Sequence, residues 1–222
     1  CGDVGFGKTE VAMRAAFIAA SQGEQVAVIA PTTLLARQHF KTFAERFRGT
    51  PITVRPLSRF VSARDAAETR KGLAEGSVDI VVGTHAVLAK AVRFKRLGLL
   101  IVDEEQHFGV AHKERLKELR SDIHVLTLTA TPIPRSLSLA QYGDMDLSVL
   151  DEKPPGRQPV ETAVLPAGRV PEVIEHLRGA LAEGRQAYWV CPLVAESETE
   201  GRGAELGAAE ARFAGLRLAL GE

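Results

Sequence analysis

The sequence is poor in cysteine, has no long apolar run and carries no excess of charge of either sign. Of its 222 residues only Cys1 and Cys191 are cysteines, too few for a disulfide framework and without the spacing of a metal site. It has no run of 18 apolar residues and no signal peptide, so we expect a soluble, intracellular chain with no membrane partner. The formal net charge is zero, so bulk basicity does not indicate a nucleic-acid partner.

Apolar residues make up 45% of the chain and charged residues 25%, which allows one large or two small domains with real cores. Short apolar runs alternate with segments of helical spacing. We expect strands at 25–30, 52–57, 79–82, 99–102 and 124–128, and helices at 8–22, 33–47, 63–75 and 111–120. Thr33 is a candidate N-cap, with Leu34 and Phe43 facing inward. The alternation is typical of an α/β fold with a doubly wound, mostly parallel sheet.

Near the start of the chain, Gly2 to Thr9 form a complete G-x-x-x-x-G-K-T phosphate loop. The glycines let the backbone curl so that several N–H groups point into one concavity, and the helix that should begin near Lys8 adds the positive end of its dipole. Lys8 would reach the β- and γ-phosphates, and the Thr9 hydroxyl would ligate Mg²⁺. The alternative is a glycine-rich turn with Lys8 merely solvated. A phosphate loop follows a strand, so we expect a fragment that lacks its leading strand.

A pair of acidic residues follows the apolar run at 99–102 and is the second motif of a nucleotide site. Asp103 stands at the end of that predicted strand, where a carboxylate beside a phosphate loop can hold Mg²⁺ directly or through water. The next residue, Glu104, can orient or deprotonate an attacking water. The alternative is a solvated acidic turn, which the phosphate loop upstream makes the weaker interpretation.

Small hydroxyl residues and backbone N–H groups also follow other predicted strands. In parallel sheets the carboxyl ends of the strands meet at one edge, so we expect these clusters to converge on one surface. Thr129 and Thr131 could sense a γ-phosphate, or could belong to a turn before a proline. The others would suit the phosphate oxygens of a nucleic-acid strand, although each alone is more often a helix cap. They are Pro31, Thr32, Thr33, Gly83, Thr84 and His85.

The helix after Thr33 offers Arg37, Gln38 and His39 as an extension of that contact surface, with solvated helix residues as the alternative. A domain boundary is expected where proline, glycine and charge concentrate. We therefore divide the chain into a domain at 1–150, a linker at 151–159 and a partial second domain at 160–222. In the last part we expect strands at 160–165 and 186–191 and helices at 171–182 and 204–220, with Tyr188 and Trp189 in a core.

These motifs, in this order, resemble the motor core of superfamily 2 helicases of the RecG/Mfd group. CGDVGFGKTEVAMRAAF resembles motif I, APTTLLARQH motif Ia, VGTHAVL the motif after it, LLIVDEEQHFGVAHKERLKEL motif II and LTLTATPIPRSL motif III. The first two thirds resemble Mfd more, whereas from about residue 141 the strings YGDMDLSVLDEKPPGRQPV and EGRQAYWVCPLVAESE resemble RecG. The resemblance implies a RecA-like fold of the P-loop NTPase class, followed by the truncated start of a second RecA-like domain.

The resemblance also implies an ATP-dependent DNA helicase or translocase that uses ATP and Mg²⁺ in the bacterial cytoplasm. ATP hydrolysis would drive movement on double-stranded or forked DNA in repair and recombination, with RNA polymerase and excision-repair proteins as partners if the role is Mfd-like. Nucleotide-binding positions would be Gly2, Gly5, Phe6, Gly7, Lys8, Thr9 and Glu10. Thr9 and Asp103 would hold the metal, Lys8, Asp103, Glu104 and Gln106 would be catalytic, and Thr129 and Thr131 would couple hydrolysis to domain motion.

The sequence departs from the complete family pattern. The segment that would cradle adenine and the later motifs that carry the arginine finger are absent, so we expect negligible ATP hydrolysis by this fragment alone. A different two-lobed motor, such as a restriction or chromatin-type translocase, is one alternative, but it would not be expected to carry TATPIPR and QAYWVCPLV. The second alternative is a non-catalytic remnant of such a motor that binds nucleotide or DNA.

Overall fold

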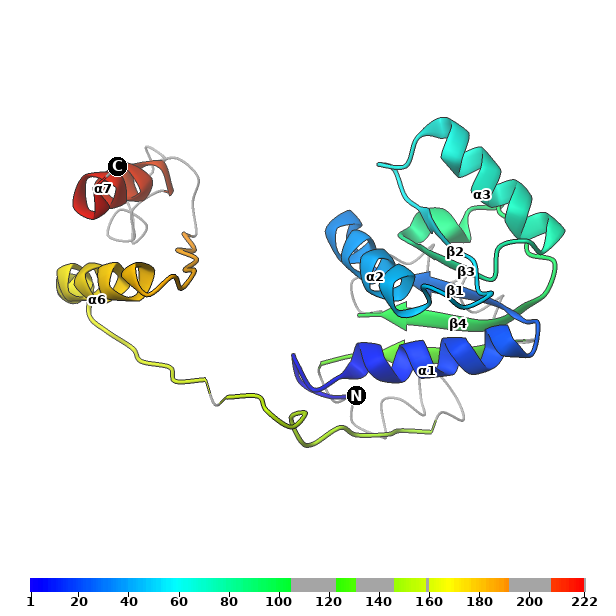
Figure 1. The fold of residues 1–222 in the computed structure, drawn as a ribbon, viewed down its shortest axis with the longest axis horizontal. Coiled ribbons are helices and arrows are strands. Elements are labelled where there is room, and N and C mark those ends of the chain that lie inside the picture. Colours follow the sequence, from blue (N-terminus) through cyan, green and yellow to red (C-terminus); the bar gives the residue numbers. More distant parts are fainter. Residues whose placement is uncertain (105–122, 131–145, 159, 192–208, 222) are drawn as a thin grey trace. The chain divides into compact units, whose positions relative to one another are not determined.

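The computed structural model of the chain describes residues 1–104, 123–130, 146–158, 160–191 and 209–221. The chain forms two compact units, Cys1–Arg157 and Gln158–Glu222 (Figure 1). The division falls within the segment that the sequence indicates as a linker. The predicted helix at 111–120 lies outside the described residues.

A five-stranded, wholly parallel sheet forms the centre of the first unit (Figure 1). Its strands lie in the order β2-β3-β1-β4-β5. They span Gln25–Ile29 (β1), Val54–Leu57 (β2), Ile80–Gly83 (β3), Leu97–Asp103 (β4) and His124–Leu128 (β5). The predicted α/β fold with a doubly wound parallel sheet is confirmed.

Helices cover both faces of the sheet because successive residues of a buried strand point to opposite sides. On β1, Val26 and Val28 face α1 (Lys8–Ser21) and α2 (Thr33–Arg46), in a cluster with Met13 and Phe43. The neighbouring positions Ala27 and Ile29 face the other layer, which α3 (Ala63–Glu75) and the 3₁₀ helix η1 (His85–Leu88) supply. All five residues of β1 are buried, as expected for the central strand of such a sheet.

A buried glutamine joins three parts of this unit where β1 begins. The Gln25 amide donates to the carbonyl oxygens of Leu73 and Val78, at 2.9 and 2.8 Å, and its Oε1 accepts from the N–H of Arg96 at 2.9 Å. The side chain thereby ties β1 to the end of α3 and to the segment that enters β4. Its polar groups are paired, which offsets the cost of burying an amide.

The start of α2 differs from the prediction in two respects. The N-cap is Thr32, not Thr33: the Thr32 hydroxyl accepts from the N–H of Leu35 at 3.2 Å, so the helix begins at Thr33. Leu34 is 75% exposed, and its predicted inward orientation is wrong. The first turn of a helix at a sheet edge extends beyond the strands, so nothing covers this side chain in the described part of the chain.

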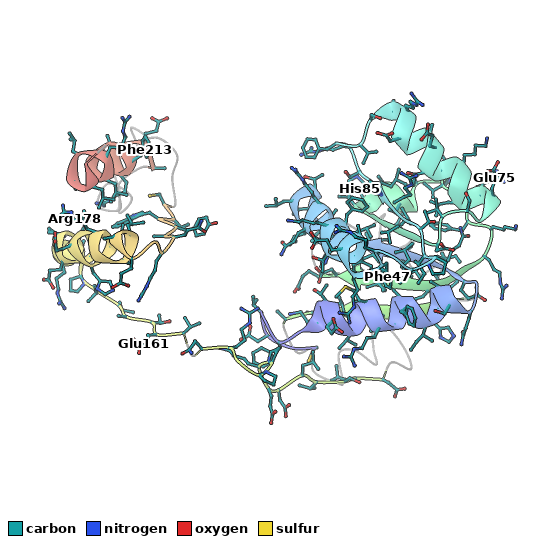
Figure 2. The ribbon with its side chains drawn as sticks, viewed as in Figure 1. Phe47, Glu75, His85, Glu161, Arg178 and Phe213 are labelled. Atoms are coloured by element: carbon teal, nitrogen blue, oxygen red, sulfur yellow. The ribbon has the colours of Figure 1, made fainter. Side chains whose placement is uncertain are left out.

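The second unit contains α6 (Val170–Ala182), which follows the short 3₁₀ turn η3 (Ala167–Arg169), and α7 (Ala209–Leu220). The Arg178 guanidinium on α6 (Figure 2) donates to the carbonyl oxygen of Ala219 on α7 at 2.5 Å. The strands predicted at 160–165 and 186–191 do not form, and Tyr188 is 91% exposed, not in a core. A strand needs a ladder partner for its backbone groups, and the described part of this unit offers none.

Candidate nucleotide and magnesium site

The register of the sheet brings the predicted polar clusters to one edge. Ile29, the last residue of β1, lies opposite Gly83 on β3 and Val102 on β4, and Asp103 lies opposite Leu128 on β5. The segments that continue from these four strands therefore leave the sheet side by side. The sequence prediction that they converge on one edge is confirmed.

The phosphate loop is held at the same edge. The Gly2 N–H donates to the carbonyl oxygen of Thr129 at 3.1 Å, and Gly2 forms a parallel bridge with Leu150. Gly5 and Gly7 have φ angles of 84° and 93°, a left-handed conformation that side chains disfavour. α1 begins directly after them. In the first turn the N–H of Glu10 donates to the carbonyl oxygen of Gly7 at 2.9 Å, whereas those of Lys8 and Thr9 come before any carbonyl partner of the helix. The loop and the helix start therefore form an anion-binding concavity.

Lys8 closes this loop from inside. Its ammonium group donates to the carbonyl oxygen of Gly2 at 2.6 Å and approaches that of Asp3 at 3.3 Å. The cation thus lies among the loop carbonyls, at the mouth of the concavity. A phosphate oxygen is a charged acceptor and forms a stronger hydrogen bond with an ammonium group than a neutral carbonyl does. The Lys8 ammonium group is therefore placed to exchange the carbonyl oxygens of the loop for the oxygens of a bound phosphate.

Asp103 is the last residue of β4 and is 8% exposed. Its Oδ2 lies 2.7 Å from Nε2 of His39 on α2, and the two side chains are 12% and 11% exposed. Among the described residues, no hydrogen bond or ion pair occupies its Oδ1, which is left for a further ligand. Hard oxygen ligands such as a carboxylate and a threonine hydroxyl suit Mg²⁺, so Asp103 and Thr9 fit the metal that the sequence implies.

Glu104 follows in a left-handed conformation, with φ of 50°, which is uncommon for a residue other than glycine. Its N–H donates to the carbonyl oxygen of Leu128 at 2.9 Å, and its Oε1 accepts from the N–H of Ala130 at 3.2 Å. Both contacts lie on the segment that also receives Gly2. The start of the phosphate loop and the candidate catalytic carboxylate therefore contact consecutive residues, Thr129 and Ala130.

Glu10, one of the predicted nucleotide-binding residues, has two cationic partners. Its Oε1 lies 3.0 Å from Arg14 one turn along α1 and 2.5 Å from Arg46 at the end of α2. These contacts join the two helices that cover one face of the sheet. The carboxylate is in an ion-pair network and contributes to helix packing whatever its role toward nucleotide.

The residues predicted to contact nucleic acid lie at the same edge of the sheet, but they differ in how accessible their polar groups are. Thr32 uses its hydroxyl as the cap of α2, and Thr84 is only 4% exposed. Gly83 is packed so closely that an added Cβ would lie 2.0 Å from the carbonyl oxygen of Leu57. His85 is exposed at the start of η1 (Figure 2), while Pro31 and Thr33 are partly buried.

Two predicted site residues, Gln106 and Thr131, lie outside the described residues. One contact that the sequence reasoning missed is that of His39, which was placed on a solvated or nucleic-acid-facing surface. A signal was available, because His39 shares the helical stripe of Ala36 and Phe43, both of which are buried. The helical period therefore indicates an inward-facing histidine.

A pocket of about 370 Å³ lies away from this site, against α3 and the edge strand β2. Its walls include Phe40, Arg55, Glu68 and Thr69, and none of the predicted site residues. In the described ranges, no helix is both long enough and apolar enough to cross a membrane. Within those same ranges, no three or more His, Cys, Asp or Glu side chains gather as a metal cluster would require.

A parallel sheet with a phosphate loop and an Asp-Glu pair at its carboxyl edge is typical of the RecA-like fold of P-loop NTPases. Residues 1–139 match the DEAD/DEAH box helicase family, and the chain belongs to that family. Its relatives include the transcription-repair-coupling factor of Bacillus subtilis, 52% identical over 200 residues, and that of Staphylococcus haemolyticus, 56% identical over 165. These matches cover 89% and 74% of this chain but 17% and 14% of the relatives, so the chain spans a small part of their length.

Solved structures agree with this assignment. A structure of RecG bound to a three-way DNA junction superposes with a TM-score of 0.69 at 40% identity, over 87% of this chain and 26% of that one. The fold alone is shared with S. cerevisiae Dbp5 L327V bound to RNA and ADP BeF3, with a TM-score of 0.51 at 16% identity, over 68% of this chain and 40% of that one. The predicted likeness to both Mfd and RecG is confirmed, and the 200 residues matched in the B. subtilis relative include positions on both sides of residue 141.

Proposed function

We propose that this chain is the nucleotide-binding part of an ATP-dependent DNA helicase or translocase that acts in DNA repair. The observation that carries the proposal is the meeting of the phosphate loop and Glu104 on Thr129 and Ala130, at 3.1 and 3.2 Å. A nucleotide held by the loop would present its γ-phosphate to this carboxylate. The similarity to transcription-repair-coupling factors and to RecG supports repair as the process.

In this proposal each side chain has one task. Lys8 and the N–H groups of the loop hold the phosphates, and Thr9 and Asp103 hold Mg²⁺, which neutralises charge on the phosphates. Glu104 orients or deprotonates the attacking water. Gln106 links the nucleotide site to the DNA surface, and Thr129 and Thr131 couple hydrolysis to domain motion.

DNA would bind along the carboxyl edge of the sheet. The partly buried Pro31 and Thr33 and the exposed His85 lie there, and backbone N–H groups at helix starts suit phosphate oxygens without reading sequence. The class of substrate is double-stranded or forked DNA, in line with the junction bound by the RecG relative. RNA polymerase and excision-repair proteins would be partners if the complete protein resembles the transcription-repair-coupling factors in role.

Hydrolysis is proposed for the complete motor and not for this chain alone. The chain covers 17% of the B. subtilis relative, and in two-lobed motors a second lobe supplies positive charge to the γ-phosphate. The 222-residue chain should therefore bind Mg²⁺·ATP and hydrolyse it negligibly. A turnover rate stimulated by DNA to the level of a complete helicase would contradict this part of the proposal.

The test is titration of the chain with ATP and Mg²⁺ by calorimetry, with duplex DNA binding measured in parallel. Lys8→Ala should abolish nucleotide binding and leave DNA affinity unchanged. Lys71→Ala, which removes an exposed lysine of α3, should change neither. If the wild-type chain binds duplex DNA but no Mg²⁺·ATP, the alternative function holds: the chain is a DNA-binding remnant of such a motor.

A further inference from the structure

The hydrogen bond between His39 and Asp103 is a contact that the proposed function does not require. It joins α2 to the end of β4, 64 residues apart in the chain, at a distance of 2.7 Å. Both side chains are almost fully withdrawn from solvent, so water does not compete strongly for either partner. A hydrogen bond to a charged group under such conditions holds its geometry better than one at the surface.

The chemistry of the two side chains indicates which atom donates the hydrogen bond and which accepts it. A carboxylate that holds Mg²⁺ is ionised and can only accept, so in the proposed metal-bound state Nε2 of His39 would donate its N–H to Oδ2 of Asp103. The bond therefore sets the rotation of the carboxylate about its Cβ–Cγ bond. It also leaves Oδ1 as the oxygen that remains for a metal ion.

We infer that His39 is a positioning residue that orients the Asp103 carboxylate for Mg²⁺, an inference that rests on the proposed function. Side chains that hydrogen-bond to a metal ligand, without contacting the metal themselves, commonly affect how tightly the site binds the metal. His39 does this from α2, the helix whose first turn lies at the candidate DNA edge. The ligand for Mg²⁺ is thus oriented by the element that begins at the DNA surface.

The packing around His39 explains how the imidazole is held. It lies one turn before Phe43, which is fully buried, and one turn after Ala36, which is 3% exposed. Both neighbours belong to the apolar stripe by which α2 packs on the sheet. The ring therefore has little freedom to turn away from Asp103.

The test compares two substitutions of similar volume in the full chain. His39→Leu removes the donor, and His39→Gln keeps an N–H donor at nearly the place of Nε2. The measurement is the Mg²⁺ concentration at half-maximal binding of a fluorescent ATP analogue, together with its affinity in EDTA. His124→Leu is the matched control, because His124 is exposed at the opposite end of the sheet, where it pairs with Leu99.

We expect His39→Leu to raise the half-saturating Mg²⁺ concentration about 10-fold, with the affinity in EDTA unchanged. His39→Gln should stay within about 3-fold of wild type, as a retained donor predicts, and His124→Leu should match wild type. An equal loss with and without Mg²⁺ in His39→Leu would mean a merely structural role and overturn the inference. A loss of about 10-fold in His39→Gln would also overturn it, and this measurement does not depend on whether the leucine variant folds. A wild-type chain that binds no Mg²⁺·ATP would instead overturn the proposed function, and the inference with it.

Discussion

The Glu104 carboxylate accepts a hydrogen bond from the backbone N–H of Ala130, at 3.2 Å. Glu104 is also the one residue other than glycine with a positive φ among those that the structure describes. Backbone strain of this kind persists where surrounding contacts hold it, and it concentrates at functional sites. The contact to Ala130 and the backbone bond to Leu128 are such restraints.

The strain at Glu104 predicts an unusual order of stabilities. Both Glu104→Ala and Glu104→Gly lose the bond to Ala130, but only glycine relieves the left-handed conformation. We expect the glycine variant to be more stable than the alanine variant by about 1 kcal/mol. Urea unfolding of the two variants measures this difference. The opposite order, which is normal at ordinary backbone positions, would show that the residue is not held at positive φ.

The buried amide of Gln25 predicts a large loss of stability on truncation. Gln25→Ala would leave the buried Val78 carbonyl oxygen and the part-buried Arg96 N–H without this partner. It would also remove one of two donors to the Leu73 carbonyl oxygen, which keeps the N–H of Lys95 at 3.1 Å. We expect the free energy of unfolding to fall by about 2–3 kcal/mol. Gln38→Ala, at an exposed site on α2, should change it by less than about 0.5 kcal/mol. Chemical denaturation followed by circular dichroism provides both values.

Close packing at Gly83 predicts that this glycine is required irrespective of nucleic acid. An added Cβ would meet the carbonyl oxygen of Leu57 and, at 2.7 Å, a methyl group of Val87. Gly83→Ala should therefore lower stability by about 3 kcal/mol. Gly168→Ala is the comparison, since no atom of the described residues lies within 4 Å of a Cβ added there. Thermal unfolding of both variants measures this loss of stability. A Gly83→Ala protein as stable as wild type would refute the packing argument.

The two candidate roles of Thr32 can be separated by charge. Thr32→Asp keeps an acceptor for the Leu35 N–H and should preserve stability, whereas Thr32→Ala should lose about 1 kcal/mol. If DNA passes this edge, the aspartate variant should bind duplex DNA more weakly than the alanine variant, because its carboxylate repels phosphates. Fluorescence anisotropy at fixed salt measures this. Gln22→Glu, which adds the same charge at the far end of α1, should leave affinity unchanged.

Local signals explain what could be predicted from the sequence. The limits of α3 at Ala63 and Glu75 were predicted correctly, because a residue next to each end stops the helix there. The Ser62 hydroxyl accepts from the N–H of Asp65 at 3.1 Å, and Gly76 ends the helix at a φ of 83°. The phosphate loop is similarly local, since its glycines and lysine lie within eight residues.

What could not be predicted depends on partners distant in the sequence. The bond between His39 and Asp103 depends on the crossing of a helix and a strand that no local pattern determines. The predicted strands at 160–165 and 186–191 failed for the same reason, because apolar runs favour a strand but do not supply its neighbour. The roles of Gln106 and Thr131 remain predictions.

The order of the strands also has a consequence for how the domain folds. Its central strand pairs with Ile80 and Leu99 through Val26, so neither neighbour is close in sequence. Parallel pairings of this kind close long loops before any ladder forms, which makes folding slow. During synthesis, β1 must therefore remain unpaired until β3 and β4 have left the ribosome. Its five residues are all buried in the folded sheet and four of them are apolar, so they form a segment that a nascent chain has to keep from aggregating.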